Sequence, residues 1–150
     1  AIPMGKKAVE TKQQKRVMGL VRRWKPILGL ASWSIQVTFS EEESDCSNCR
    51  KTDGHTEWHT IMQNATDWAY MNTALVVFLP AIRDMSMEKL EEVVIHELCH
   101  TVVAEMRPDV DPQDYDTKHE ERVVTMLAHS FLRTATYYEA KGQKLGGKKK

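Results

Sequence analysis

The sequence predicts an α+β fold in which a small β-sheet packs against three helices. Segments near the N-terminus, in the middle and near the C-terminus have apolar residues at helical spacing. Two further segments have the composition of strands, and 150 residues are enough for one hydrophobic core but few for two. We therefore expect a single domain over residues 1–150, with a flexible basic tail from about residue 141.

The first two elements are a helix and a strand. Apolar residues recur at helical spacing over residues 11–28, with Lys and Arg between them. Pro26 is expected to bend or shorten the end of this helix. Residues 32–40 alternate between apolar and polar side chains, which is typical of a half-buried strand.

The next segments are a loop and a second strand. Residues 41–66 are polar, acidic and rich in turn-forming residues, so we expect a loop or a weakly ordered hairpin there. Residues 68–79 predict the second strand, with the strongest signal from residue 73, and Pro80 is expected to end it.

Two helices complete the chain. Ser86 can cap a helix that runs to about Glu105, because Pro108 disfavours its continuation. Residues 107–116 form a loop rich in Asp and Pro, and residues 117–138 form the last helix. The predicted order is helix, strand, loop, strand, helix, helix.

Charge is spread unevenly although the net charge is zero. The two ends are basic, with eight Lys and Arg in residues 1–26 and five Lys in residues 141–150, and the middle is acidic. Basic ends can bind nucleic acid, but solvated termini are the more ordinary interpretation. No apolar run is long enough to span a bilayer, so a cytoplasmic protein without a membrane partner is expected.

One motif points to metal chemistry. His96 and His100 are four residues apart, so on a helix both imidazoles project from one face and can bind one zinc ion. Glu97 follows the first histidine, where its carboxylate can accept a proton from water bound to that metal. The His-Glu-x-x-His pattern therefore predicts two zinc ligands and a catalytic base.

A catalytic zinc site of this kind needs a third protein ligand. The candidates open the last helix, where Glu120 projects near the middle of the apolar face. Glu120 is therefore preferred, with Glu121 and His119 as alternatives. A competing role for Glu120 is a capping box with Thr117, in which its carboxylate accepts from the Thr117 amide.

The residues around the motif resemble a known group. The segments 93–100 (VVIHELCH) and 120–124 (EERVV) are similar to small phage and prophage proteins that have a minimal gluzincin-type core. In gluzincins the third ligand is a Glu on a following helix, often about twenty residues after the second His, which corresponds to Glu120. The sequence departs from larger gluzincins at Val124 and Thr125, where an Asp is expected, and in lacking an Asn before the ligand Glu.

The resemblance implies a zincin-like fold and a zinc-dependent peptidase that acts on a peptide or protein, in the host cytoplasm if the protein is phage-encoded. One alternative is a non-catalytic zinc-stabilised phage module with a structural or interaction role. The other is a SprT-like protease acting at DNA, suggested by the His-Glu-Leu-Cys-His sequence and the basic termini. That family uses a third His, which would be His119.

Cysteines form a second candidate site. Cys46 and Cys49 precede His55 and His59 with a spacing close to that of a zinc knuckle. The more ordinary interpretation is a reduced cysteine pair in a polar loop. Cys99 lies in an apolar helical stretch, where we expect a small buried side chain.

Overall fold

The computed structural model describes residues 11–42, 61–106 and 117–143. These ranges contain both helices and strands, which confirms the α+β class. Within them, no helix is both long enough and apolar enough to cross a bilayer. In chain order the elements are α1 (Lys12–Ile27), β1 (Ser34–Ser40), β2 (Met62–Asp67), β3 (Asn72–Phe78), α2 (Leu79–Ile82), α3 (Met87–Val103), the 3₁₀ helix η1 (Ala104–Met106) and α4 (Thr117–Ala140).

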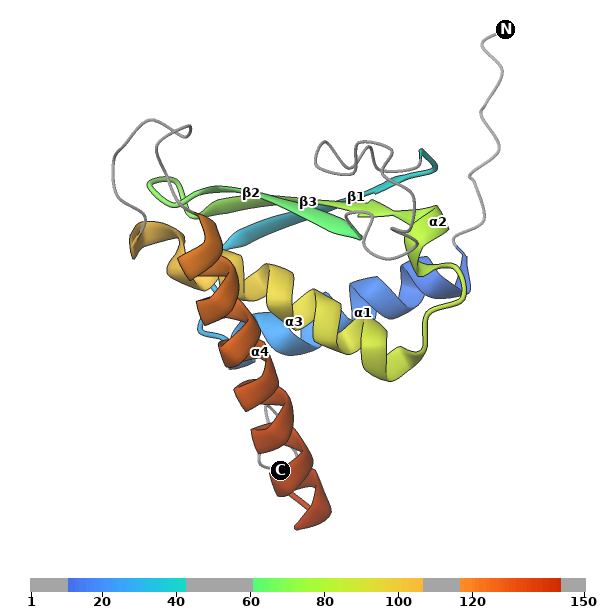
Figure 1. The fold of residues 1–150 in the computed structure, drawn as a ribbon, viewed down its shortest axis with the longest axis vertical. Helices are drawn as coiled ribbons and strands as arrows, with labels where there is room; N and C mark the ends of the chain where they lie inside the picture. Colours follow the sequence, from blue (N-terminus) through green and yellow to red (C-terminus); the bar gives the residue numbers. More distant parts are fainter. Residues whose placement is uncertain (1–10, 43–60, 107–116, 144–150) are drawn as a thin grey trace, which may run out of the picture.

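The three strands form a mixed sheet in the order β1-β3-β2. Strand β1 pairs with β3 in parallel, and β2 pairs with β3 antiparallel. Helices α1 and α3 lie on one face of the sheet, and α4 packs across α3 and runs away from the strands (Figure 1). Helix α3 therefore lies between the sheet on one side and α4 on another.

Helix α1 agrees with its predicted range to within one residue at each end, and Pro26 lies inside its last turn. Trp24 is fully buried, and its indole Nε1 donates to Glu91 Oε1 of α3 at 2.7 Å. Arg23 contacts both Glu91 and Glu139 of α4. Side chains near the C-terminal end of α1 thus contact both α3 and α4.

Residues 41–66 were predicted to form a loop or a weakly ordered hairpin, and the structure places strand β2 at the end of this segment. Residues 43–60 lie outside the described ranges. Only Met62 of β2 is a buried apolar residue. The alternate positions Asn64 and Thr66 are polar and bond to neighbouring elements. The strand has no apolar alternation, because its inward positions are filled by hydrogen-bonding side chains.

The second predicted strand is shorter than expected and begins at Asn72. Trp68 accepts a backbone hydrogen bond from Met71 at 3.2 Å and lies in the turn between β2 and β3. Pro80 does not simply end β3, because it occupies the first turn of α2, where a missing N–H costs no intrahelical bond.

Helices α3 and α4 lie where the sequence predicted them. Ser86 caps α3 by accepting from the Lys89 amide at 3.2 Å. Helix α3 ends at Val103 and continues as η1 to Met106. Helix α4 begins at Thr117 as predicted and extends two residues further, to Ala140.

Candidate metal centre

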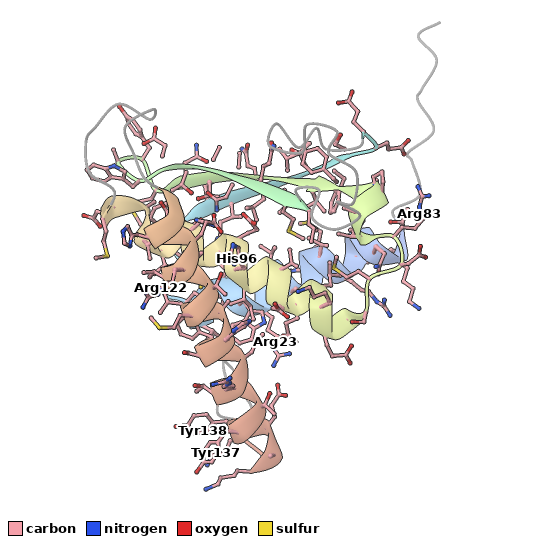
Figure 2. The ribbon with its side chains drawn as sticks, in the orientation of Figure 1. Arg23, Arg83, His96, Arg122, Tyr137 and Tyr138 are labelled. Atoms are coloured by element: carbon pink, nitrogen blue, oxygen red, sulfur yellow. The ribbon has the colours of Figure 1, made fainter. Side chains whose placement is uncertain are left out.

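The two motif histidines lie on the side of α3 that faces α4. His96 and His100 are one helical turn apart, with ring centroids 5.0 Å apart and ring planes at 74°. His100 is largely buried, with 9% of its surface exposed, and His96 is partly buried (Figure 2 marks His96 on α3, beside α4). The i, i+4 spacing has the effect that the sequence predicted, since both imidazoles meet the first turns of α4.

Glu121 of α4 brings a carboxylate to both rings. Its Oε2 lies 3.2 Å from Nε2 of His96, and its Oε1 lies 3.1 Å from Nε2 of His100. The ligating atoms of these three residues all lie within 4.8 Å of one another. Among the described residues, this is the group of three that can hold a metal ion.

These distances fit a zinc ion. Ligand atoms at 2.0–2.1 Å from a tetrahedral zinc are about 3.3 Å apart, close to the separations between Glu121 and the two Nε2 atoms. Two imidazoles and one carboxylate are also a donor set that zinc accepts, and three protein ligands leave one position for water or substrate. Small side-chain adjustments would therefore be enough to load the site.

The opposite ring nitrogens have their own partners on α4. Nδ1 of His100 lies 2.9 Å from Oε1 of Glu120, and Nδ1 of His96 lies 3.5 Å from the Thr125 hydroxyl. A partner on Nδ1 orients the ring and directs Nε2 to the metal, and a carboxylate partner also makes the imidazole a better ligand. Sequence reasoning missed Thr125, although its position one turn after Glu121 gave a signal.

The geometry favours Glu121 over the preferred Glu120 as the third ligand. Glu120 points inward as predicted and is only 8% exposed, but its carboxylate meets the nitrogen of His100 that faces away from the metal position. His119 is exposed and does not belong to the ligating group. Glu121 lies at the edge of the buried face of α4 and reaches the two Nε2 atoms from there.

Glu120→Ala is expected to weaken zinc binding by about 10–100-fold, because the Nδ1–H of His100 loses its carboxylate acceptor. Glu120→Gln keeps a neutral acceptor and should recover part of that loss. Competition with a chelator of known zinc affinity measures both variants. A loss of many orders of magnitude in Glu120→Ala would instead return Glu120 to the role of ligand.

Glu97 lies beside this group and is partly buried. Burial, together with the nearby Glu121 carboxylate, raises the pKa of Glu97 to about 8. Among the described residues, its carboxyl has no hydrogen-bond or ion-pair partner. A carboxyl held next to a metal position without a protein partner is free to exchange a proton with water there.

Burial also affects the neighbouring groups. Burial and the adjacent His100 lower the pKa of His96, which favours the neutral imidazole that a metal requires. Cys99 is fully buried as predicted, and burial raises the pKa of its thiol to about 12. Cys99 does not belong to the ligating group found among the described residues.

The second candidate site, Cys46, Cys49, His55 and His59, lies outside the described residues. It stays a prediction from the sequence.

Comparisons with known proteins give no assignment. No protein-family model matches the chain, and neither the curated proteins nor the solved structures include a significant match. The interpretation of the site therefore rests on its residues and their geometry.

Proposed function

We propose that this protein is a zinc-dependent peptidase whose metal is held by His96, His100 and Glu121. The observation that supports this most strongly is the convergence of the two Nε2 atoms and the Glu121 carboxylate, next to the Glu97 carboxyl, which has no partner within the described ranges. A metal site with an open position and an adjacent base is the arrangement that hydrolysis by water requires.

Each residue has a distinct part in this proposal. A zinc ion bound here would polarise a peptide carbonyl and lower the pKa of a water molecule. Glu97 accepts the proton of the attacking water and then delivers it to the leaving amine. Glu120 and Thr125 hold the two imidazoles through their Nδ1 atoms.

The sequence resemblance supports the same reading. The motif on α3 and a glutamate at the start of α4 are what a minimal gluzincin-type core of the phage and prophage group contains. We propose a zincin-like arrangement of sheet, motif helix and ligand helix on this basis, with a peptide or protein as substrate. The ligand at Glu121 lies one residue beyond the position that the resemblance implied.

The SprT-like alternative has less support, because it needs His119 as a ligand and this residue is exposed outside the ligating group. The zinc-stabilised structural module shares the metal site and differs only in lacking turnover. Glu97 favours the peptidase, because a purely structural site gains nothing from a partly buried carboxyl that no described side chain contacts.

Digestion of a mixed peptide library separates these functions. We expect zinc-loaded protein to cleave library peptides and chelator-treated protein to be inactive until zinc is restored. Bound zinc without cleavage of any peptide would support the structural module, and the absence of bound zinc would contradict both.

A further inference from the structure

A network of four uncharged side chains joins the sheet to the motif helix. Asn64 and Thr66 belong to β2, Thr73 to β3 and Thr101 to α3. The three threonine hydroxyls lie 3.0–3.3 Å from one another. Thr73 and Thr101 are essentially inaccessible to solvent, at 0% and 1% exposure. Polar groups buried to this extent destabilise a fold unless they are paired, so the network fixes one arrangement of sheet and helix.

Asn64 is the centre of this network, and its amide can adopt only one orientation. Its Nδ2 donates to the backbone carbonyl of Glu97 at 2.7 Å and to the Thr101 hydroxyl at 2.9 Å. Its Oδ1 accepts from the Thr66 hydroxyl at 2.5 Å. Since a carbonyl can only accept, the NH₂ group must face Glu97, and Thr66 holds the opposite end.

The contacts of Asn64 fall on the residue that carries the proposed base. Glu97 and Thr101 are four residues apart, so they lie on the same side of α3, about 100° around the helix axis from the pair His96 and His100. The histidines therefore face α4 while the residue 97 backbone is held by β2. The side of α3 that carries the histidines thus contacts α4, and the side that carries residues 97 and 101 is bonded to β2.

We propose that Asn64 is a positioning residue that holds the backbone of residue 97, and with it the Glu97 carboxyl, in place relative to the metal position. This role rests on the proposed zinc-dependent function. The carboxyl moves with the backbone that carries it, so a local backbone shift of about 1 Å at residue 97 displaces the carboxyl by a similar distance. Misplacement by about 1 Å can lower a reaction rate by about 100-fold.

Asn64→Leu tests this role, because leucine has a similar size and neither donates nor accepts. Gln63→Leu is the matched control, since Gln63 is the preceding residue of β2 and is exposed. Zinc affinity is measured by chelator competition, and acetohydroxamate binding to the zinc-loaded protein serves as the second probe. A hydroxamate binds zinc through two oxygens and gives its hydroxyl proton to a carboxylate beside the metal, so its affinity reports where Glu97 lies.

We expect Asn64→Leu to bind zinc within about threefold of the wild type, because His96, His100 and Glu121 are held by α3 and α4. Acetohydroxamate affinity should fall at least about tenfold, as it should in Glu97→Gln, and turnover of any cleaved peptide should fall in kcat with KM little changed. Gln63→Leu should match the wild type in all three measurements. A role in folding alone would not separate the two affinities.

Thr66→Val provides the second variant if Asn64→Leu does not fold. It keeps Asn64 and removes the donor to its Oδ1, together with the contacts of the Thr66 hydroxyl to Thr73 and Thr101. Its expected loss of acetohydroxamate affinity is smaller and in the same direction. Unchanged acetohydroxamate affinity in the folded variants, or a parallel loss of zinc affinity, would overturn the role of Asn64 alone. A wild-type protein that binds no zinc would overturn the proposed function, and this role with it.

Discussion

Glu97→Gln is expected to lower peptide hydrolysis by about 10²–10⁴-fold while zinc remains bound. Glutamine has nearly the shape of glutamate but cannot accept the proton of the attacking water. The ligands on α3 and α4 are unchanged, so zinc affinity should stay close to that of the wild type. Turnover and zinc content of the same purified sample measure both quantities. A variant with wild-type turnover would remove Glu97 from the mechanism.

The same variant should change how the stability of the zinc-free protein depends on pH. The pKa of the Glu97 carboxyl is about 8 in the fold and 4.5 in the unfolded chain, so the unfolded chain releases this proton first as pH rises. The protonated Glu97 carboxyl makes its full contribution to the free energy of unfolding below about pH 4.5. This contribution is lost as pH rises to about 8, and the loss lowers the free energy of unfolding by roughly 3–5 kcal/mol. Glutamine does not titrate, so its variant escapes this loss.

Urea unfolding of both zinc-free proteins at pH 5 and pH 8 measures this effect. The difference between the two pH values contains every titrating group, but the comparison between Glu97→Gln and the wild type isolates Glu97. We expect the variant to gain stability relative to the wild type as pH rises. An equal pH dependence of stability in the two proteins would show that the Glu97 carboxyl is not buried beside the Glu121 carboxylate.

The second large effect is expected at the third ligand. Glu121→Ala should weaken zinc binding by at least about 10³-fold, because two imidazoles alone hold the ion poorly and structural zinc binding is worth about 10–16 kcal/mol in total. His119→Ala is the control, since His119 is exposed on the same helix near the site. Zinc titration against a competing chelator ranks these variants with Glu120→Ala. A loss confined to His119→Ala would move the protein toward the SprT-like alternative.

The sequence alone was sufficient to predict the three long helices and the pairing of the two motif histidines. Helical periodicity is a local property, so α1, α3 and α4 were predicted to within a few residues. The i, i+4 rule placed His96 and His100 together without any tertiary information, because one helix carries both. Glu97 comes directly after His96 on the same helix, so its place beside the histidines was also predictable from the sequence.

The parts that sequence reasoning did not identify depend on contacts between elements. Strand β2 has no apolar alternation, since Asn64 and Thr66 face a helix more than thirty residues away in the chain. The helical wheel of α4 predicted correctly that Glu120 points inward, but it could not tell which ring nitrogen lies opposite. That depends on how α3 and α4 cross, which places Glu121 at both Nε2 atoms.

The two cysteines of the second candidate site complicate any count of metal ions. Cys46 and Cys49 are expected to be dispensable for the metal site between α3 and α4, because that site has a ligand set of its own. A fall from two zinc ions to one in the Cys46→Ser, Cys49→Ser double variant would reveal a second site. It would leave the first site as described.

Zinc stoichiometry of this double variant after dialysis, with and without His96→Ala, shows whether the two histidines of α3 hold a metal ion. We expect one zinc ion per chain in the double variant, because His96, His100 and Glu121 remain. We expect none to survive dialysis once His96 is replaced, because one imidazole and one carboxylate hold the ion too weakly. A double variant without zinc, or one that keeps its zinc after His96→Ala, would contradict the assignment of the metal centre.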